Sequence, residues 1–292
     1  MLKILPQLFY ETPEYQKILV DGLSSIIHKK VHEPIYQKEG YVSTHAITLV
    51  LKGTLRIEND KCLLVTVKEN QMVFVPKGLY TMSDILPDNG SFEAIVFFFD
   101  EEVISQYLKS LNLKAKKDKC ISHFLFDYSE DIRQYTESLL KLYGRKEKMH
   151  RSFTSLKLIE LLHLITVANA DQCFPSALNS LSNKERKGIR AFMEANFSKP
   201  LGIEDYAYLT GRSLSSFRRD FKTQFGVSPK QWLIDKRLDK AHGLLSHNNT
   251  TVFDVVMETG YENMSHFIKA FHKRYGIPPK QFLIKKRKEV LV

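Results

Sequence analysis

A stretch of 21 residues occurs twice in this chain, and this repetition constrains the fold more than any other feature of the sequence. The segment FRRDFKTQFGVSPKQWLIDKR at Phe217–Arg237 returns 50 residues later as FIKAFHKRYGIPPKQFLIKKR at Phe267–Arg287, with ten of the 21 positions identical. A repeat of this kind indicates two copies of one structural unit. The sequence therefore predicts a C-terminal region built from two similar units.

Each copy begins with a helix that has one aromatic face. Three rings lie four residues apart in each copy: Phe217, Phe221 and Phe225 in the first, and Phe267, Phe271 and Tyr275 in the second. Side chains at this spacing share one face of an α-helix, so we expect the rings to be core. Gly226 and Gly276 are predicted to end the two helices in a left-handed cap, and Pro229 and Pro279 to open the helices that follow.

A short helical segment and a glycine turn precede each aromatic helix. The segments are IEDYAYLTG, before Ser213, and VFDVVMETG, before Tyr261. A short helix, a tight turn and a second helix make a helix-turn-helix unit, so the helices that start at Ser213 and Asn263 are predicted to be recognition helices. The second turn is one residue longer, which predicts a slightly different direction for the second recognition helix.

The duplicated unit resembles a known family. Two helix-turn-helix units, the second reading TGYENMSHFIKAFHKR and then YGIPPKQF, are similar to the DNA-binding domain of AraC/XylS-type transcription regulators, from Asn183 to the end of the sequence. The resemblance implies that double-stranded DNA is a partner and that the protein activates transcription by recruiting RNA polymerase. It also implies a cupin-like N-terminal sensor domain, with helices that pair two subunits into a homodimer.

Charge is divided very unevenly along the chain. Residues 1–182 hold 22 Lys and Arg against 22 Asp and Glu, whereas residues 183–292 hold 21 against 11 and so carry the whole net charge of +10. A basic excess confined to one domain is the electrostatic footprint expected of nucleic-acid binding. A basic surface can also serve solubility alone, but the duplicated motif favours DNA.

One continuous helical pattern, Pro229 to Leu245, joins the two units, with Ser228 as its predicted N-cap. Its 17 residues would span about 25 Å, enough to hold two recognition helices roughly 34 Å, or one DNA turn, apart once their own offsets are added. Because the units repeat by translation, one protomer is predicted to read two successive major-groove segments of an asymmetric promoter site. Thr251 and Asp254 match a capping box that opens the second unit.

The faces opposite the rings are polar and basic, and they supply the candidate base-contacting residues. From the helical positions and the family resemblance, these are Ser215, Arg218, Arg219 and Lys222 in the first unit, and Asn263, Ser265, His266, Lys269 and Lys273 in the second. For each residue the alternative is a phosphate contact or plain exposure. Candidate phosphate contacts are Lys222, Lys230, Arg237, Lys280 and the run Lys285–Lys288.

The region from His45 to Phe99 has the pattern of short β-strands. ITLVLKGTLRIEN, CLLVTV, QMVFVPKG and FEAIVFFF alternate or run apolar between turn residues, which suggests a small barrel or jelly roll. Position and rhythm resemble the cupin-type sensor domain of AraC-like regulators. Aromatic residues at 74, 92 and 97–99 could line a ligand pocket, but buried core is the commoner role for such residues.

Residues 100–170 turn helical, and a linker is predicted at residues 171–182. In the resembled family such helices pair subunits, so Leu156, Ile159, Leu162 or Leu164 could form a dimer seam, or else pack on the chain's own barrel. The predicted class is α+β: a cupin-like β-barrel with a helical dimerisation segment at residues 1–170, the linker, and an all-α domain of two helix-turn-helix units at residues 183–292.

No catalytic or metal-binding constellation is evident, so we predict a regulator without cofactors rather than an enzyme. His45 lacks the second histidine of enzymatic cupins, and His28 and His32, four apart, fall in a segment that favours strand. Three scattered cysteines and the lack of a membrane-spanning run fit a cytoplasmic protein with no membrane partner. The N-terminal domain is expected to sense a small-molecule effector or, alternatively, to be an interaction module controlled by a regulatory protein.

Overall fold

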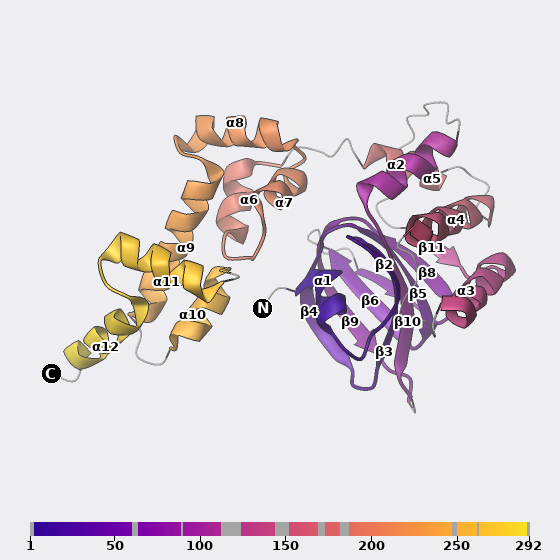
Figure 1. Ribbon diagram of the computed structural model, residues 1–292, viewed down its shortest axis with the longest axis horizontal. Helices are drawn as coiled ribbons and strands as arrows, with labels where there is room; N and C mark the ends of the chain where they lie inside the picture. The colour runs from indigo at the N-terminus through magenta and orange to yellow at the C-terminus, as the bar shows by residue number, and fades with distance from the viewer. Residues whose placement is uncertain are drawn as a thin grey trace. The chain divides into compact units, whose positions relative to one another are not determined.

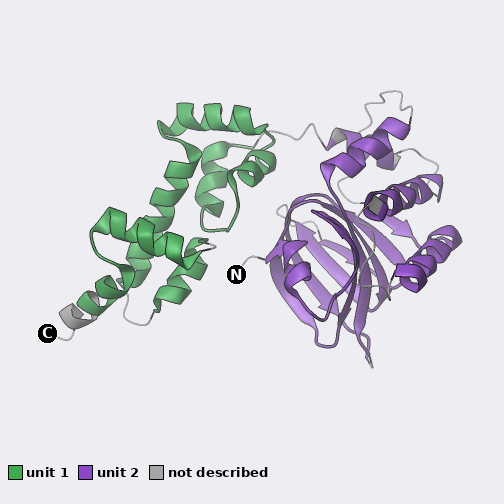
Figure 2. Ribbon diagram, viewed as in Figure 1, with its two compact units in different colours: residues 1, 183–292 green, residues 2–182 purple. Residues whose placement is uncertain are grey.

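The computed structural model describes residues 3–59, 64–88, 90–111, 124–143, 152–168, 173–181, 187–246, 250–261 and 263–290. The chain divides into two compact units, residues 2–182 and residues 183–292 (Figure 2). The first unit holds all the described strands, and the second is helical (Figure 1). The α+β class predicted from the sequence is confirmed.

Two β-sheets form the N-terminal unit (Figure 1). Their strands are β1 Lys3–Leu5, β2 Gln16–Asp21, β3 Ser24–Val31, β4 Ile35–Val42, β5 His45–Lys52, β6 Thr54–Asn59, β7 Leu64–Val67, β8 Gln71–Val75, β9 Gly78–Ile85, β10 Phe92–Phe99 and β11 Phe124–Asp127. One sheet has the order β1-β4-β9-β6-β7 and the other β11-β8-β5-β10-β3-β2. All pairings are antiparallel except that of β1 with β4.

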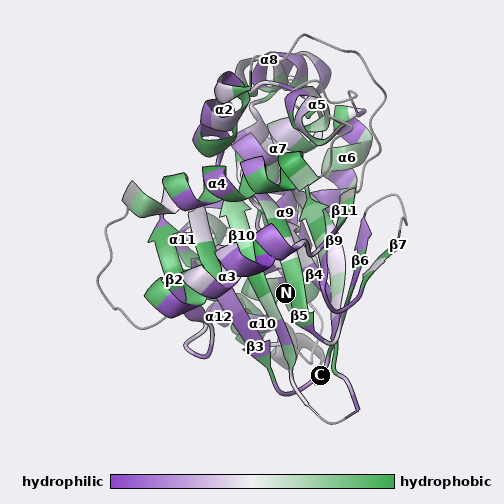
Figure 3. Ribbon diagram, turned by 90° about the vertical axis from the view of Figure 1, so that its right-hand side faces the viewer, coloured by the Kyte–Doolittle hydropathy of each residue, from purple (hydrophilic) through white to green (hydrophobic). Residues whose placement is uncertain are grey.

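The strands at the centre of the six-stranded sheet are buried on both faces. In β10, Ala94, Val96 and Phe98 belong to the core between the two sheets. Ile95 and Phe97, which alternate with them, belong to a second core on the opposite face. Because neighbouring side chains on a strand point to opposite faces, a strand covered on both sides needs a continuous apolar run. The hydrophobic colouring along β5 and β10 follows this requirement (Figure 3).

Four helices take part in the second core: α2 Glu101–Ser110, α3 Glu130–Tyr143, α4 Ser152–Ala168 and α5 Cys173–Ser180. Helix α5 corrects the predicted linker at residues 171–182, because Phe174 and Leu178, four residues apart, are buried in this core. Phe174 lies edge-on to Phe74 and to Phe126 of β11, with ring centroids 5.3 and 5.0 Å apart. Residues 171, 172 and 182 lie outside the described part of the chain.

The predicted barrel is not closed. The described strands make two separate sheets, as in a jelly roll, instead of one sheet closed on itself. Helices α2–α5 cover the apolar outer face of the six-stranded sheet, which could not face water. The short helix α1 Gln7–Glu11 contributes Phe9 to the core between the sheets. Phe92 and Phe98 belong to the same core, the role that the sequence favoured for them.

Helix α4 uses most of its apolar surface within its own unit. Leu162 is 1% exposed, and Ile159 and Leu164 pack against the same core, which favours own-unit packing for these three residues. Leu156, by contrast, is 61% exposed. None of the described helices has the length and apolar character to cross a bilayer.

A buried ion pair lies in the core between the two sheets. Lys29 of β3 contacts Asp84 of β9, with Nζ and Oδ2 2.5 Å apart, and their side chains are only 12% and 3% exposed. The ammonium group also lies over the rings of Phe9 and Phe92, 5.6 and 5.3 Å from their centroids. The pair therefore bridges the two sheets inside an otherwise apolar layer. His28, on the same strand, contacts Glu93, and the described residues contain no cluster suited to a metal ion.

Seven helices are described in the C-terminal unit, and Figure 1 shows their arrangement. They are α6 Ile189–Asn196, α7 Ile203–Leu209, α8 Leu214–Phe225, α9 Pro229–Leu245, α10 Val252–Thr259, α11 Met264–Tyr275 and α12 Pro279–Val290. Helices α7 and α8 form the first helix-turn-helix unit, and α10 and α11 form the second. The structure confirms the helices predicted from Ser213 and Asn263 onward and the joining helix Pro229–Leu245.

The predicted helix ends are also confirmed. Gly226 and Gly276 follow α8 and α11 with φ of 75° and 78°, a left-handed conformation that favours glycine. Ser228 caps α9 by accepting a hydrogen bond from the Gln231 amide at 3.2 Å. Thr251 and Asp254 form the capping box of α10. These ends depend on neighbours in the chain, which is why the sequence could predict them.

Gly260 in the second turn is expected to tolerate alanine much less well than Gly226. Both glycines have positive φ, 79° and 75°, but a Cβ at Gly260 would lie 2.5 Å from the Ser198 carbonyl oxygen, whereas nothing lies within 4 Å at Gly226. Gly226→Ala should therefore cost only the left-handed strain, about 1–2 kcal/mol. Gly260→Ala should cost more, because backbone must move.

Urea unfolding monitored by the fluorescence of Trp232, the single tryptophan of the chain, measures both losses. Equal losses in the two variants would contradict the close packing of the second turn against the Ser198 carbonyl.

Candidate nucleic-acid interface

The first recognition helix, α8, is divided into a buried and an exposed face. Phe217 and Phe221 are fully buried, and Phe221 stacks on Phe225 with centroids 4.2 Å apart. All four residues predicted to contact bases on this helix are exposed: Ser215, Arg218, Arg219 and Lys222. The aromatic face fixes the helix on its unit, and the polar face is left free for a partner.

The second recognition helix, α11, repeats this division. Phe267 and Phe271 are fully buried. The predicted base-contacting residues of this unit are again all exposed: Asn263, Ser265, His266, Lys269 and Lys273. Asn263 has a second role, since its Oδ1 accepts hydrogen bonds from the amides of Ser265 and His266 at 2.9 and 3.1 Å and so caps the helix. Only its side-chain NH₂ is left to donate to a base.

Two exposed residues of α11 were missed from the sequence. His272 takes the position that Lys222 has in the first copy, and Ile268 takes that of Arg218. Ile268 is 37% exposed, and an apolar side chain on a recognition helix can contact the methyl group of thymine. Aligning the two copies residue by residue would have identified both.

Helix α9 is tied to both units. Toward α6, Lys236 pairs with Glu194 at 2.9 Å. Toward the second unit, Arg274 pairs with Asp235 and with Asp239, the latter at 2.6 Å, and Lys240 donates to the Glu258 carbonyl at 2.9 Å. The contacts with α6 hold α9 against the first unit, and the contacts with α10 and α11 hold it against the second. Together they fix the spacing of the two recognition helices.

Arg237 of α9, predicted to contact phosphate, makes structural contacts within the protein. Its Nε and Nη2 donate to the carbonyl oxygens of Phe197 and Lys199 at 2.8 and 2.7 Å. Carbonyls just past a helix end lack partners within the helix, so a guanidinium group there satisfies them. Arg237 therefore closes the C-terminal end of α6 with two of its three guanidinium nitrogens.

Tyr206 of α7 supports the same helix end. Its hydroxyl donates to the Asn196 carbonyl at 2.9 Å. Burial raises the pKa of Tyr206 to about 12, although the neighbouring Arg237 guanidinium works against the rise. The hydroxyl keeps its proton at neutral pH and remains a donor.

The remaining predicted phosphate contacts lie at the starts of α9 and α12 and on α12. Lys230, Lys280 and Lys285 are exposed. The side chains of residues 286–288 lie outside the described part. Lys230 and Lys280 occupy equivalent positions in the two copies, one residue after the proline that opens each helix. Each unit thus offers a lysine near the point where its recognition helix ends.

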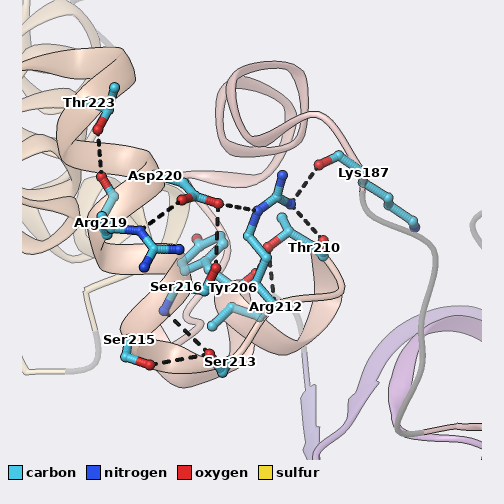
Figure 4. A network of polar contacts seen from close by, with 11 residues as sticks. Lys187, Tyr206, Thr210, Arg212, Ser213, Ser215, Ser216, Arg219, Asp220 and Thr223 are labelled. Atoms are coloured by element: carbon cyan, nitrogen blue, oxygen red, sulfur yellow. Dashed lines mark hydrogen bonds and ion pairs between the residues drawn. The ribbon is translucent and has the colours of Figure 1, made fainter.

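A polar network at the first turn was also missed from the sequence (Figure 4). The Arg212 guanidinium lies between the carboxylate of Asp220 and the backbone carbonyls of Lys187 and Thr210. Asp220 in turn approaches Arg219 and Ser216. Arg212 and Asp220 are eight residues apart, a spacing that carries no local sequence signal.

Two family models match this chain. The model described as "ExsA N-terminal regulatory domain" matches residues 45–175. The model described as "Helix-turn-helix domain" matches residues 206–285, which include both recognition helices. Both matches agree with the resemblance to AraC/XylS-type regulators that the sequence indicated.

Curated relatives of this chain are named regulators. The virulence regulon transcriptional activator VirF of Yersinia enterocolitica is 29% identical over 142 residues, which are 49% of this chain and 52% of VirF. The HTH-type transcriptional regulator ExsA of Pseudomonas aeruginosa is 31% identical over 111 residues, 38% of this chain and 40% of ExsA. The alignments thus span about half the length of these relatives or less.

Among solved structures, that of an apo ToxT variant from Vibrio cholerae aligns with 91% of this chain and 98% of its own, at 11% identity and a TM-score of 0.45.

Proposed function

We propose that this protein is a sequence-specific DNA-binding transcription regulator that activates transcription, and that it acts by binding rather than by catalysis. The observation that carries the proposal is the pair of recognition helices held on α9, each with a buried aromatic face and an exposed polar face. The basic excess of residues 183–292 supports DNA as the partner. The activator role is supported by the named activators among the relatives. Contact with RNA polymerase is proposed from the family resemblance alone.

The eight exposed polar residues predicted to contact bases on α8 and α11, with the cap residue Asn263, are the proposed reading surface. Arginine can make two hydrogen bonds to guanine, and serine, asparagine and lysine can reach other base edges. Lys230, Lys280 and Lys285 are proposed to contact phosphates and to supply salt-sensitive affinity. With DNA as the target, the proposed place of action is the cytoplasm.

The N-terminal unit is proposed to receive the signal. A small-molecule effector in the core between the sheets and a regulatory protein on the surface are the two alternatives. Exposed apolar residues on α3 and α4 favour a protein contact, with either a regulator or a second subunit: Leu142, Phe153, Leu156 and Val167. If this face pairs subunits, Leu156→Glu should shift the protein to monomers in sedimentation experiments, and an unchanged distribution would count against pairing there.

Two substitutions are expected to separate base reading from phosphate binding. Lys280→Ala should weaken binding to all sequences about equally and lower the slope of log affinity against log salt by about one. Arg219→Ala should relax the preference at one base pair, with a loss of about 1–3 kcal/mol there.

Affinities for a panel of singly substituted DNA probes at two salt concentrations measure both effects. The site for the panel comes from selection of bound fragments from genomic DNA. Both side chains are exposed, so both variants should remain folded, as the fluorescence of Trp232 can verify. Identical effects of the two substitutions across the panel would contradict the assignment of Arg219 to base reading.

A further inference from the structure

We infer that Asp220 and Arg212 are positioning residues that hold Arg219 ready to read a base. The inference rests on the proposed function and extends it to two side chains that do not themselves reach DNA. It starts from a carboxylate in an unexpected place. Asp220 stands on a recognition helix, within a basic domain, where a free negative charge would repel phosphate.

The charge of Asp220 is compensated within the protein. Arg212 Nε lies 3.3 Å from Asp220 Oδ2, and the side chains are 10% and 24% exposed. An ion pair with this little exposure is screened less by solvent than a surface pair. Ser216 Oγ also approaches Oδ2, at 3.5 Å. One oxygen of the carboxylate is thus committed to the interior of the unit.

Arg212 itself is fixed by the backbone. Its Nη1 donates to the carbonyl oxygens of Lys187 and Thr210 at 2.8 and 2.7 Å, and its own amide donates to the Ala207 carbonyl at 2.9 Å. The guanidinium therefore has one orientation, set by the start of α6 and the end of α7. The ion pair with this fixed guanidinium holds the Asp220 carboxylate in place.

The second oxygen of Asp220 faces the predicted reading residue. Oδ1 lies 3.5 Å from Nε of Arg219, whose side chain is 76% exposed (Figure 4). With the carboxylate next to Nε, the two terminal nitrogens of the Arg219 guanidinium, Nη1 and Nη2, point outward. Those nitrogens can make the paired contact with guanine, which requires a defined plane. A long exposed side chain loses less rotamer entropy on binding if it is already oriented.

The second unit supports this assignment by contrast. At the positions of Arg219 and Asp220, α11 has Lys269 and Ala270. A lysine ammonium is a compact charge on a flexible stem and has no plane to orient, so it needs no carboxylate beside it. The carboxylate therefore occurs in the copy whose reading residue is an arginine.

A double-mutant cycle between Asp220 and Arg219 tests the inference. The measured quantity is the ratio of affinities for two probes that differ at the base pair where Arg219→Ala loses its preference. We expect Asp220→Ala to lower this ratio by about twofold or more when Arg219 is present, the lower bound for coupled neighbours. In the Arg219→Ala background it should leave the ratio unchanged.

The affinity of Asp220→Ala for DNA of unrelated sequence distinguishes loss of positioning from damage to the fold. Removing a negative charge should leave this affinity unchanged or raise it, whereas a misfolded unit would lose it. If Asp220→Ala fails to fold, Asp220→Asn, which keeps the size of the side chain, is the variant to measure. It should also lower the ratio. Glu204→Gln, which removes an exposed carboxylate on α7, is the matched control and should leave the ratio unchanged.

An unchanged ratio in Asp220→Ala, or an equal fall with and without Arg219, would overturn the inference and leave the proposed function standing. If Arg219→Ala changes no base preference at all, the proposed reading role of Arg219 fails, and the inference fails with it.

Discussion

Replacing Phe221 with alanine is expected to destabilise the C-terminal unit by about 3–5 kcal/mol, the usual cost of removing a buried phenylalanine ring. Phe221 is fully buried and contacts Phe217, Phe225 and Trp232, with centroids 5.6, 4.2 and 5.8 Å away. The ring joins the recognition helix to the helix that carries both units. DNA binding should therefore be lost indirectly, through unfolding of the first unit.

Urea unfolding followed by Trp232 fluorescence measures this loss, because the tryptophan lies against the deleted ring. Phe271→Ala in the second copy, also fully buried, is expected to cost a similar amount. Arg219→Ala is the control, since it should lose base preference at unchanged stability. Phe221→Ala with an unchanged free energy of unfolding would contradict the assignment of the aromatic face to the core.

Replacing Asp84 with alanine is expected to destabilise the N-terminal unit by about 3–5 kcal/mol, because it leaves a buried ammonium group without its partner. Lys29 and Asp84 are among the least exposed charged side chains of this unit, at 12% and 3%. The aromatic rings around Lys29 offer it some stabilisation but cannot replace a carboxylate.

The matched control removes both charges. Lys29→Met combined with Asp84→Leu should lose much less stability than Asp84→Ala alone, since replacing a buried pair by apolar groups is often close to neutral. Hydrogen exchange of the β10 amides measures the stability of this unit independently of Trp232, which lies in the other unit. A double variant as unstable as Asp84→Ala would contradict the account, because the loss could not then come from an unpaired charge.

The features that the sequence predicted best are local ones. The three-ring spacing placed Phe217 and Phe221 in the core, and a glycine and a proline marked where α8 ends and α9 begins. Each of these signals acts within a few residues of the chain. The same holds for the extra residue in the second turn, which lies between Gly260 and the cap residue Asn263.

The features that the sequence missed depend on contacts between distant segments. The sequence predicted β5–β8 and β10 but missed β9, and it missed β11 within a region expected to be helical. Whether strands close into a barrel depends on pairings between strands far apart in the chain. Helix α5 was taken for linker because of Pro175 and the small polar residues around it, yet a proline in the first turn does not break a helix. Only the structure shows that α5 belongs to the N-terminal core, because its Phe174 packs against Phe74.

Within the candidate site, the sequence likewise could not predict which charged residues have structural partners. Arg237 recurs in the repeat as a basic residue of a basic domain, and only the structure places its fork on the carbonyls of Phe197 and Lys199. Arg212 and Asp220 carry no motif, and only the folded turn brings them together. The base-contacting roles of the exposed residues, Arg219 foremost among them, remain predictions.

The most direct test of the central proposal is a footprint of the full-length protein on a selected DNA site, with the number of bound protomers measured on the same fragment. One protomer should protect an asymmetric site of about 20 base pairs, with contacts in two major-groove segments one turn apart. Protection should weaken steeply as the salt concentration rises. A symmetric site fully occupied by a single protomer, or binding that is indifferent to sequence, would contradict the proposal that α8 and α11 read DNA in tandem.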